Sequence, residues 1–92
     1  MAIIATRVIA ILDMIDVMTM HYQRDSVAIE DIANSLSMSS NELTRYLDLL
    51  TRQGKIEWYE AGGQSKIKLS LDGYLVLSMQ NARRRHRLVT HS

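Results

Sequence analysis

The chain has 92 residues, of which 47% are hydrophobic, and it contains no cysteine, no proline and four glycines. This length suits one domain with one core, the composition indicates a mostly helical globular protein, and the absence of cysteine excludes disulfides, thiolate catalysis and cysteine-bound metal clusters. The net charge of +1 is unevenly distributed, since residues 1–50 hold three basic and seven acidic side chains while residues 51–92 hold eight basic and three acidic ones.

Residues 3–20 are predicted to form the first helix, because apolar side chains such as Ile11 and Ile15 recur along them at helical spacing in two adjacent stripes. So wide an apolar face exceeds what a small domain needs. The helix is either deeply buried in its own fold or packed against a second copy, and we favour the second copy. Asp13 and Asp16 interrupt the apolar run, so we expect neither a secretion signal nor a membrane span, and the default location is cytoplasmic.

Two short helices joined by a tight turn are predicted between residues 29 and 54. A brief β-type run at 27–29 precedes a helix over about residues 30–36, whose N-cap position falls on Ala28, a poor capping residue. Ser39 and Glu42 form a capping-box pattern for the third helix, which runs to about residue 53 with a leucine stripe inside. Gly54 suits the left-handed turn that ends it.

A β-hairpin and a last helix complete the chain. Residues 55–60 and 66–70 alternate between apolar and polar side chains across a flexible turn at 61–65, and we expect Trp58 in the core beneath this hairpin. Ser70 is predicted to cap a helix from residue 71 to about 87. The chain is therefore expected to be a single domain, 1–92, with residues 1–20 and 71–88 as dimerisation helices.

The order helix–strand–helix–helix–strand–wing–strand–helix resembles a winged-helix domain, an α+β fold that is mostly helical. The segment EDIANSLSMSSNELTRYLDLLTRQGKIE is similar to the helix-turn-helix of MarR-type and related small prokaryotic or viral regulators. The segment IKLSLDG resembles their second wing strand and following helix, with Ile67, Leu69, Ser70 and Gly73 at the recurring positions. The chain departs from that group in its short length and in Ala28. The resemblance implies a fold that binds double-stranded DNA and dimerises, and no effector is carried over.

Polar side chains on the third helix and the hairpin are the candidate DNA contacts. In a winged helix the third helix, about residues 39–53, lies in the major groove. Its outer face carries groups that bond to base edges or phosphates, namely Ser40, Asn41, Thr44 and Arg45. Phosphate or minor-groove contacts are expected from a second set: Arg52, Lys55, Gln64, Lys66 and Lys68. Each set also has a plainer interpretation, because exposed helix faces are normally solvated and outward lysines on a hairpin discourage aggregation. The basic run 83–87 has two interpretations, contact with the flanking DNA backbone or complement of the C-terminal end of its own helix dipole.

The sequence therefore predicts a sequence-specific transcriptional regulator that acts as a homodimer through the third helix and a wing at about residues 55–70. The alternative is a winged-helix module for protein–protein contact in a larger assembly, with little or no specific DNA binding. No enzyme is expected, because neither a nucleophile triad nor a phosphate-binding glycine loop is present. The three histidines are too scattered for a metal site, and no cofactor or membrane partner is expected.

Overall fold

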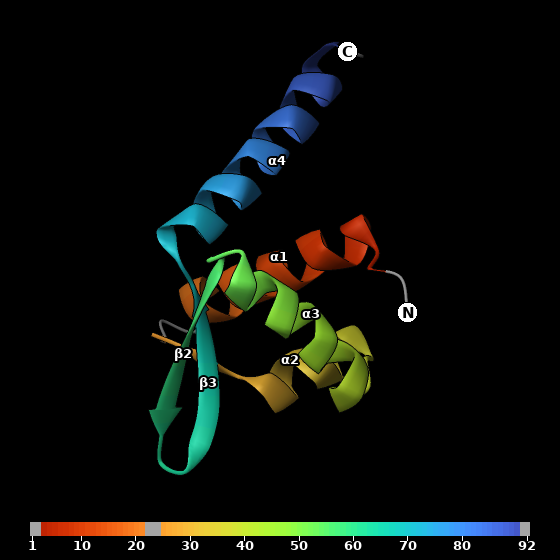
Figure 1. Ribbon diagram of the computed structural model, residues 1–92. Helices are drawn as coiled ribbons and strands as arrows, with labels where there is room; N and C mark the ends of the chain where they lie inside the picture. Colours follow the sequence, from red (N-terminus) through yellow and green to blue (C-terminus); the bar gives the residue numbers. More distant parts are fainter. Residues whose placement is uncertain (1–2, 22–24, 91–92) are drawn as a thin grey trace.

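The computed structural model describes residues 3–21 and 25–90, with the side chains of all of these except 21, 61 and 84–90. The elements follow the predicted order: α1 (Ala5–His21), β1 (Val27–Ala28), α2 (Ile29–Leu36), α3 (Ser40–Arg52), β2 (Ile56–Ala61), β3 (Gln64–Leu69) and α4 (Leu71–Thr90). Figure 1 shows α1 between α4 on one side and the pair α2 and α3 on the other. The β2–β3 hairpin extends away from the helices, and α4 extends from the rest of the domain in the opposite direction. This is a winged-helix fold, as predicted.

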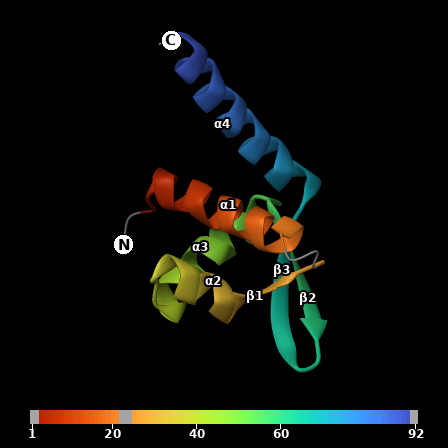
Figure 2. The ribbon, with the colours of Figure 1, turned by 180° about the vertical axis from the view of Figure 1, so that it is seen from behind.

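A three-stranded antiparallel sheet has the order β1-β3-β2, and β1 lies beside β3 in the view from behind (Figure 2). Ile67 on β3 pairs with Val27 on one side and with Trp58 on the other. The hairpin turn is shorter than the predicted 61–65, since only Gly62 and Gly63 separate the strands. Their φ angles are +59° and +78°, the left-handed pair that matches the twist of a two-residue hairpin.

The core lies where the centre of α1 meets α2, α3 and the inner face of the sheet. Among the side chains that the structure describes, fourteen buried apolar residues form it: Ile11, Leu12, Ile15, Val27, Ile32, Ala33, Leu43, Tyr46, Leu47, Leu50, Ile56, Ile67, Leu69 and Leu77. The ends of α1 are less covered, because Val17 and Met20 near its C-terminal end are exposed, as are Ile3 and Ile4 just before its first residue. The wide apolar face of this helix is therefore buried in its own fold at the centre and open at both ends.

Trp58 is not a core residue, and that prediction was wrong. Its side chain is 39% exposed, and its indole Nε1 donates a hydrogen bond of 2.6 Å to Thr51 Oγ1 at the end of α3. The strand alternation placed it on the same face as the buried Ile56. Alternation determines the face of the sheet, whereas the extent of the covering helix determines burial, and α3 ends at Arg52 beside this side chain.

α4 begins in close contact with the chain segment that follows α3. Ser70 Oγ accepts the Gly73 N–H at 3.1 Å and donates to the Gly54 carbonyl at 2.6 Å, while the Ser70 N–H donates to the Lys55 carbonyl at 3.0 Å. A Cβ on Gly73 would lie only 2.2 Å from Lys55 O, so this approach requires glycine. From this start α4 extends to Thr90, beyond the predicted end, and exposes Leu71, Leu75 and Met79 at successive turns.

Candidate nucleic-acid interface

α3 is held rigidly by its caps and by its leucine face. Ser39 Oγ accepts the Glu42 N–H at 3.2 Å, as the capping pattern predicted. At the other end the Gly54 and Lys55 N–H groups donate to Thr51 O and Leu50 O, at 3.0 and 2.9 Å. This pair of bonds, with Gly54 at a φ of +69°, is a Schellman motif. One face of α3 is buried through Leu43, Tyr46, Leu47 and Leu50, so the opposite face is presented to solvent.

The exposed face of α3 carries every predicted base-contacting residue. Ser40, Asn41, Thr44 and Arg45 are all exposed, and they occupy the N-terminal half of the helix. Thr44 Oγ1 donates to the Ser40 carbonyl at 2.7 Å, so its hydroxyl proton is used within the helix while its lone pairs remain available to a donor. Amide, guanidinium and hydroxyl groups on a helix face are the chemistry that distinguishes base pairs in a major groove.

Ser40 and Gln64 are brought together across a groove between α3 and the hairpin turn. The groove has a volume of about 350 Å³, and its lining comes from the start of α2, the start of α3 and the hairpin turn: Ala28, Ile29, Glu30, Ser40, Gly63, Gln64 and Ser65. Gln64 is exposed at the tip, and the neighbouring Ser65 hydroxyl donates to Glu60 Oε1 at 3.0 Å. Residues 61–65 contain no basic side chain, so the tip presents amide, hydroxyl and glycine backbone rather than positive charge.

The basic side chains of the hairpin lie further from its tip. Lys66 and Lys68 are each partly buried on the outer face of β3. Lys68 Nζ lies 3.7 Å from Glu57 Oε2 and 4.9 Å from the centre of the Tyr59 ring. The Tyr59 side chain raises the pKa of the Lys68 ammonium, so this lysine stays charged but is engaged within the hairpin.

Arg52 and Lys55 are separated from the polar half of α3. Arg52 is exposed in the last turn, about 18 Å from Ser40 at the helical rise per residue. Lys55 is the last residue of the Schellman motif and is half-buried. Of the nine predicted residues, the structure brings together only Ser40 and Gln64 in the lining of the groove. Asn41, Thr44 and Arg45 share the exposed face of α3 with Ser40. The remaining four lie outside the groove lining: Arg52, Lys55, Lys66 and Lys68.

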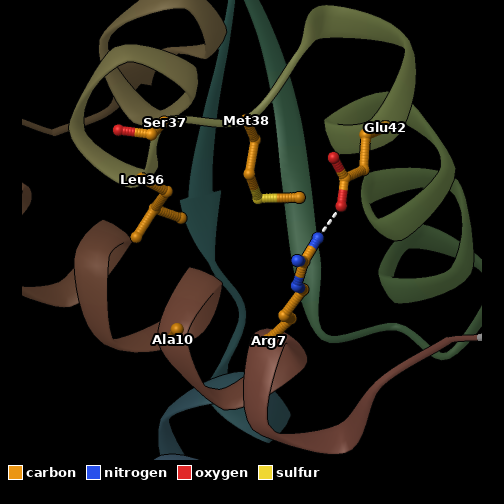
Figure 3. Close-up of a pocket in the computed structure, with 6 residues that line it drawn as sticks. All are labelled: Arg7, Ala10, Leu36, Ser37, Met38 and Glu42. Carbon is orange, nitrogen blue, oxygen red and sulfur yellow. Dashed lines mark ion pairs between the residues drawn. The ribbon is translucent and has the colours of Figure 1, made fainter.

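Sequence reasoning missed an ion pair between Arg7 on α1 and Glu42 on α3, shown in Figure 3. The pair lines a pocket of about 180 Å³ together with Ala10, Leu36, Ser37 and Met38. Arg7 and Glu42 are 35 positions apart, and neither stands in a pattern that points to the other. Only their placement on neighbouring helices reveals the contact.

Within the described residues, no three His, Asp or Glu side chains are grouped as metal ligands. The side chains of His21, His86 and His91 lie outside the described ones, as do those of the basic run after Arg83. Across residues 3–21 and 25–90, no helix has both the length and the apolar content needed to cross a membrane.

Solved structures of winged-helix regulators resemble this chain. A variant of MarR from Escherichia coli in complex with operator DNA has 20% identity and a TM-score of 0.72, over 83% of this chain and 52% of that one. A variant of MepR from Staphylococcus aureus bound to an oligodeoxyribonucleotide has 19% identity and a TM-score of 0.71, over 92% of this chain and 63% of that one. This chain thus spans about half to three fifths of the length of those two proteins.

A third similar structure is closer to this chain in length. It is a homodimeric winged helix-turn-helix DNA-binding domain from Mycobacterium bovis, a possible ArsR-family transcriptional regulator, with 20% identity and a TM-score of 0.73 over 91% of this chain and 72% of that one. No protein-family model and no curated protein sequence matches the chain. The likeness to MarR-type regulators is therefore one of fold.

Proposed function

We propose that this protein is a cytoplasmic, non-enzymatic transcriptional regulator that binds double-stranded DNA sequence-specifically as a homodimer. The observation that carries the proposal is the composition of α3, whose buried leucine face supports an exposed face of Ser40, Asn41, Thr44 and Arg45. A rigid helix with base-contacting groups on its outer side is how winged helices present themselves to a major groove. Two of the structurally similar proteins were solved with DNA bound.

In the proposed complex Asn41 and Arg45 contact base edges, while Ser40 and Thr44 contact bases or phosphates. Arginine bonds bidentately to guanine and asparagine to adenine, and such a contact contributes about 1–3 kcal/mol of discrimination. The groove between α3 and the hairpin turn accepts the sugar–phosphate backbone, with Gln64 as a neutral donor at its edge. Arg52, Lys55, Lys66 and Lys68 supply sequence-independent attraction to flanking phosphates.

Exposed apolar side chains support dimerisation through α1 and α4. Leu71, Leu75 and Met79 are 77%, 53% and 58% exposed, and they form one stripe along α4. Ile3 and Ile4, which directly precede α1, are 43% and 46% exposed. Contiguous exposed apolar surface on a small protein marks an interface. A dimer built on these helices presents two α3 helices to half-sites about one turn of DNA apart.

Selection of binding sites from a pool of random duplexes tests the proposal, and Arg45→Ala then tests the contact. We expect the unchanged protein to enrich a two-fold symmetric sequence. Arg45→Ala should weaken binding to that sequence by about 5- to 150-fold and change binding to random duplex little. Arg52→Ala is the matched control, because removal of a phosphate contact weakens binding to both duplexes similarly.

Failure to enrich any sequence, together with binding that is insensitive to salt, would refute the proposal. It would favour a protein-docking role for the same helix face, because phosphate contacts make DNA binding strongly dependent on salt.

A further inference from the structure

Two polar contacts join the N-terminal end of α1 to α3. Arg7 on α1 forms an ion pair with Glu42 in the first turn of α3 (Figure 3). One turn further along α3, the Tyr46 hydroxyl accepts a hydrogen bond of 3.2 Å from the Ile4 backbone N–H. Glu42 and Tyr46 are four residues apart and therefore lie on the same side of the helix. α1 is thus attached to α3 at two successive turns.

Packing between α1 and the α2–α3 turn is incomplete beside this ion pair. A pocket of about 180 Å³ separates α1 from the α2–α3 turn, and it is lined by Ala10, Leu36, Ser37 and Met38 as well as the ion pair. Space next to a side chain removes the dispersion contacts that hold packed elements in place. Beside the buried Leu43, the ion pair of Arg7 and Glu42 is the polar contact that joins this turn to α1.

The geometry of Glu42 shows that its carboxylate is directed toward α1. In a complete capping box the carboxylate would return to the backbone N–H of Ser39. Here Ser39 Oγ accepts the Glu42 N–H at 3.2 Å, and the Glu42 carboxylate pairs with Arg7. The Glu42 side chain is 25% exposed and that of Arg7 48%, so the pair is partly screened and contributes little to overall stability. Its effect is mainly on position.

We propose that Arg7 is a positioning residue for DNA recognition, which holds the first turn of α3 against α1 through Glu42 and acts together with the Ile4–Tyr46 hydrogen bond. The proposal rests on the proposed function. Ser40, Asn41 and Thr44 belong to the turns that Glu42 and Tyr46 fasten. Hydrogen bonds to base edges weaken steeply as distance and angle depart from their narrow optimum. Long-range attraction to phosphates is less sensitive to such a shift, so loss of the ion pair lowers selectivity more than overall affinity.

The experiment compares Arg7→Met, Arg7→Lys, Glu42→Gln and Arg7→Met made in the Glu42→Gln background. Two quantities are measured: the ratio of affinities for the selected and random duplexes, and amide exchange in the free protein. Arg7→Met keeps the apolar stem and removes the charge, and it should lower the ratio about 3-fold. Arg7→Lys keeps the charge and should retain most of the ratio. In the Glu42→Gln background Arg7→Met should have no further effect.

Exchange of the Leu43 amide, which donates to Ser39 O at 2.9 Å, should be faster in Arg7→Met without DNA present. Tyr46→Phe keeps the buried ring, removes only the acceptor for Ile4, and should lower the ratio in the same direction.

Three results would overturn the positioning role. The first is an equal loss of affinity for both duplexes that persists in the Glu42→Gln background, because Arg7 would then act on DNA only through its charge. The second is an unchanged ratio, and the third is unchanged exchange of the Leu43 amide. A native protein that enriches no sequence refutes the proposed function and the role of Arg7 together. A native protein that selects DNA but is insensitive to Arg7→Met refutes the positioning role only.

Discussion

Gly73→Ala tests the close approach that connects α4 to the rest of the fold. Gly73 is the third residue of α4, and an added Cβ would lie 2.2 Å from Lys55 O and 3.3 Å from the Leu69 side chain. The Lys55 carbonyl is not free to move away, because it accepts the Ser70 N–H at 3.0 Å. The neighbouring Gly54 carbonyl is likewise held, by the Ser70 hydroxyl at 2.6 Å. The methyl group therefore separates α4 from the α3–β2 connection.

Two opposing effects determine how much Gly73→Ala changes the free energy of unfolding. Alanine is favoured over glycine inside a helix by about 1 kcal/mol, so Gly73→Ala would stabilise a helix without this contact. Overpacking of a tight contact costs about 1–3 kcal/mol, and weakening of the hydrogen bond between Ser70 and Lys55 costs about 1 kcal/mol more. The net loss of unfolding free energy is about 1–3 kcal/mol, which for a domain of this size lowers the melting temperature by roughly 5–20 °C.

Thermal unfolding followed by circular dichroism provides the measurement. Protein concentration must be held constant, because the melting temperature of a dimer depends on it. Ser78→Ala, on an exposed part of α4, is the control, and it should change the unfolding free energy by less than about 0.5 kcal/mol. A rise in melting temperature for Gly73→Ala would show that helix propensity dominates, and it would refute the close contact between Gly73 and Lys55.

Three further predictions concern the dimer, the wing and pH. Leu75→Glu should give folded monomers in a sedimentation experiment, because Leu75 is 53% exposed and its replacement does not disturb the core. If the native protein is itself monomeric at tens of micromolar, the proposed dimer is refuted. Lys66→Ala should lower the slope of the logarithm of DNA affinity against the logarithm of salt concentration by about one unit. Lys68→Ala should lower it by less, because Lys68 already contacts Glu57 and Tyr59 within the hairpin. If both variants keep the native slope, the hairpin does not contact DNA. Burial, and after it the charge of Asp13, raises the pKa of the Asp16 carboxyl above its ordinary value of 3.8. The folded state therefore binds this proton more strongly than the unfolded state does. The free energy of unfolding falls as the pH rises from 3.8 through the raised pKa. Asp16→Asn should therefore raise the melting temperature slightly at pH 7 but not at pH 3, and equal effects at both pH values would contradict this.

The order and type of the elements follow from the sequence alone, because they depend on local interactions. Ser39, Gly54 and Ser70 are at the caps and ends where the structure has them, since capping bonds join residues only a few positions apart. The alternation in β2 and β3 predicted the hairpin, and Gly62-Gly63 made a tighter turn than the one expected. The exposed polar face of α3 likewise followed from the spacing of its leucines. Contact of that face with DNA stays a prediction.

The extent to which each surface is covered, and the identity of the distant side chains that meet, depend on how the elements pack together. Trp58 lies on the predicted face of the sheet yet is 39% exposed, because burial depends on where α3 ends. Lys68 is engaged by Glu57 and Tyr59 rather than projecting freely. Arg7 meets Glu42 because packing of the core brings α1 against α3, an outcome of many contacts that no single segment encodes. Such pairs are set by the assembled core, whereas caps and strand alternation are set within a few residues of chain.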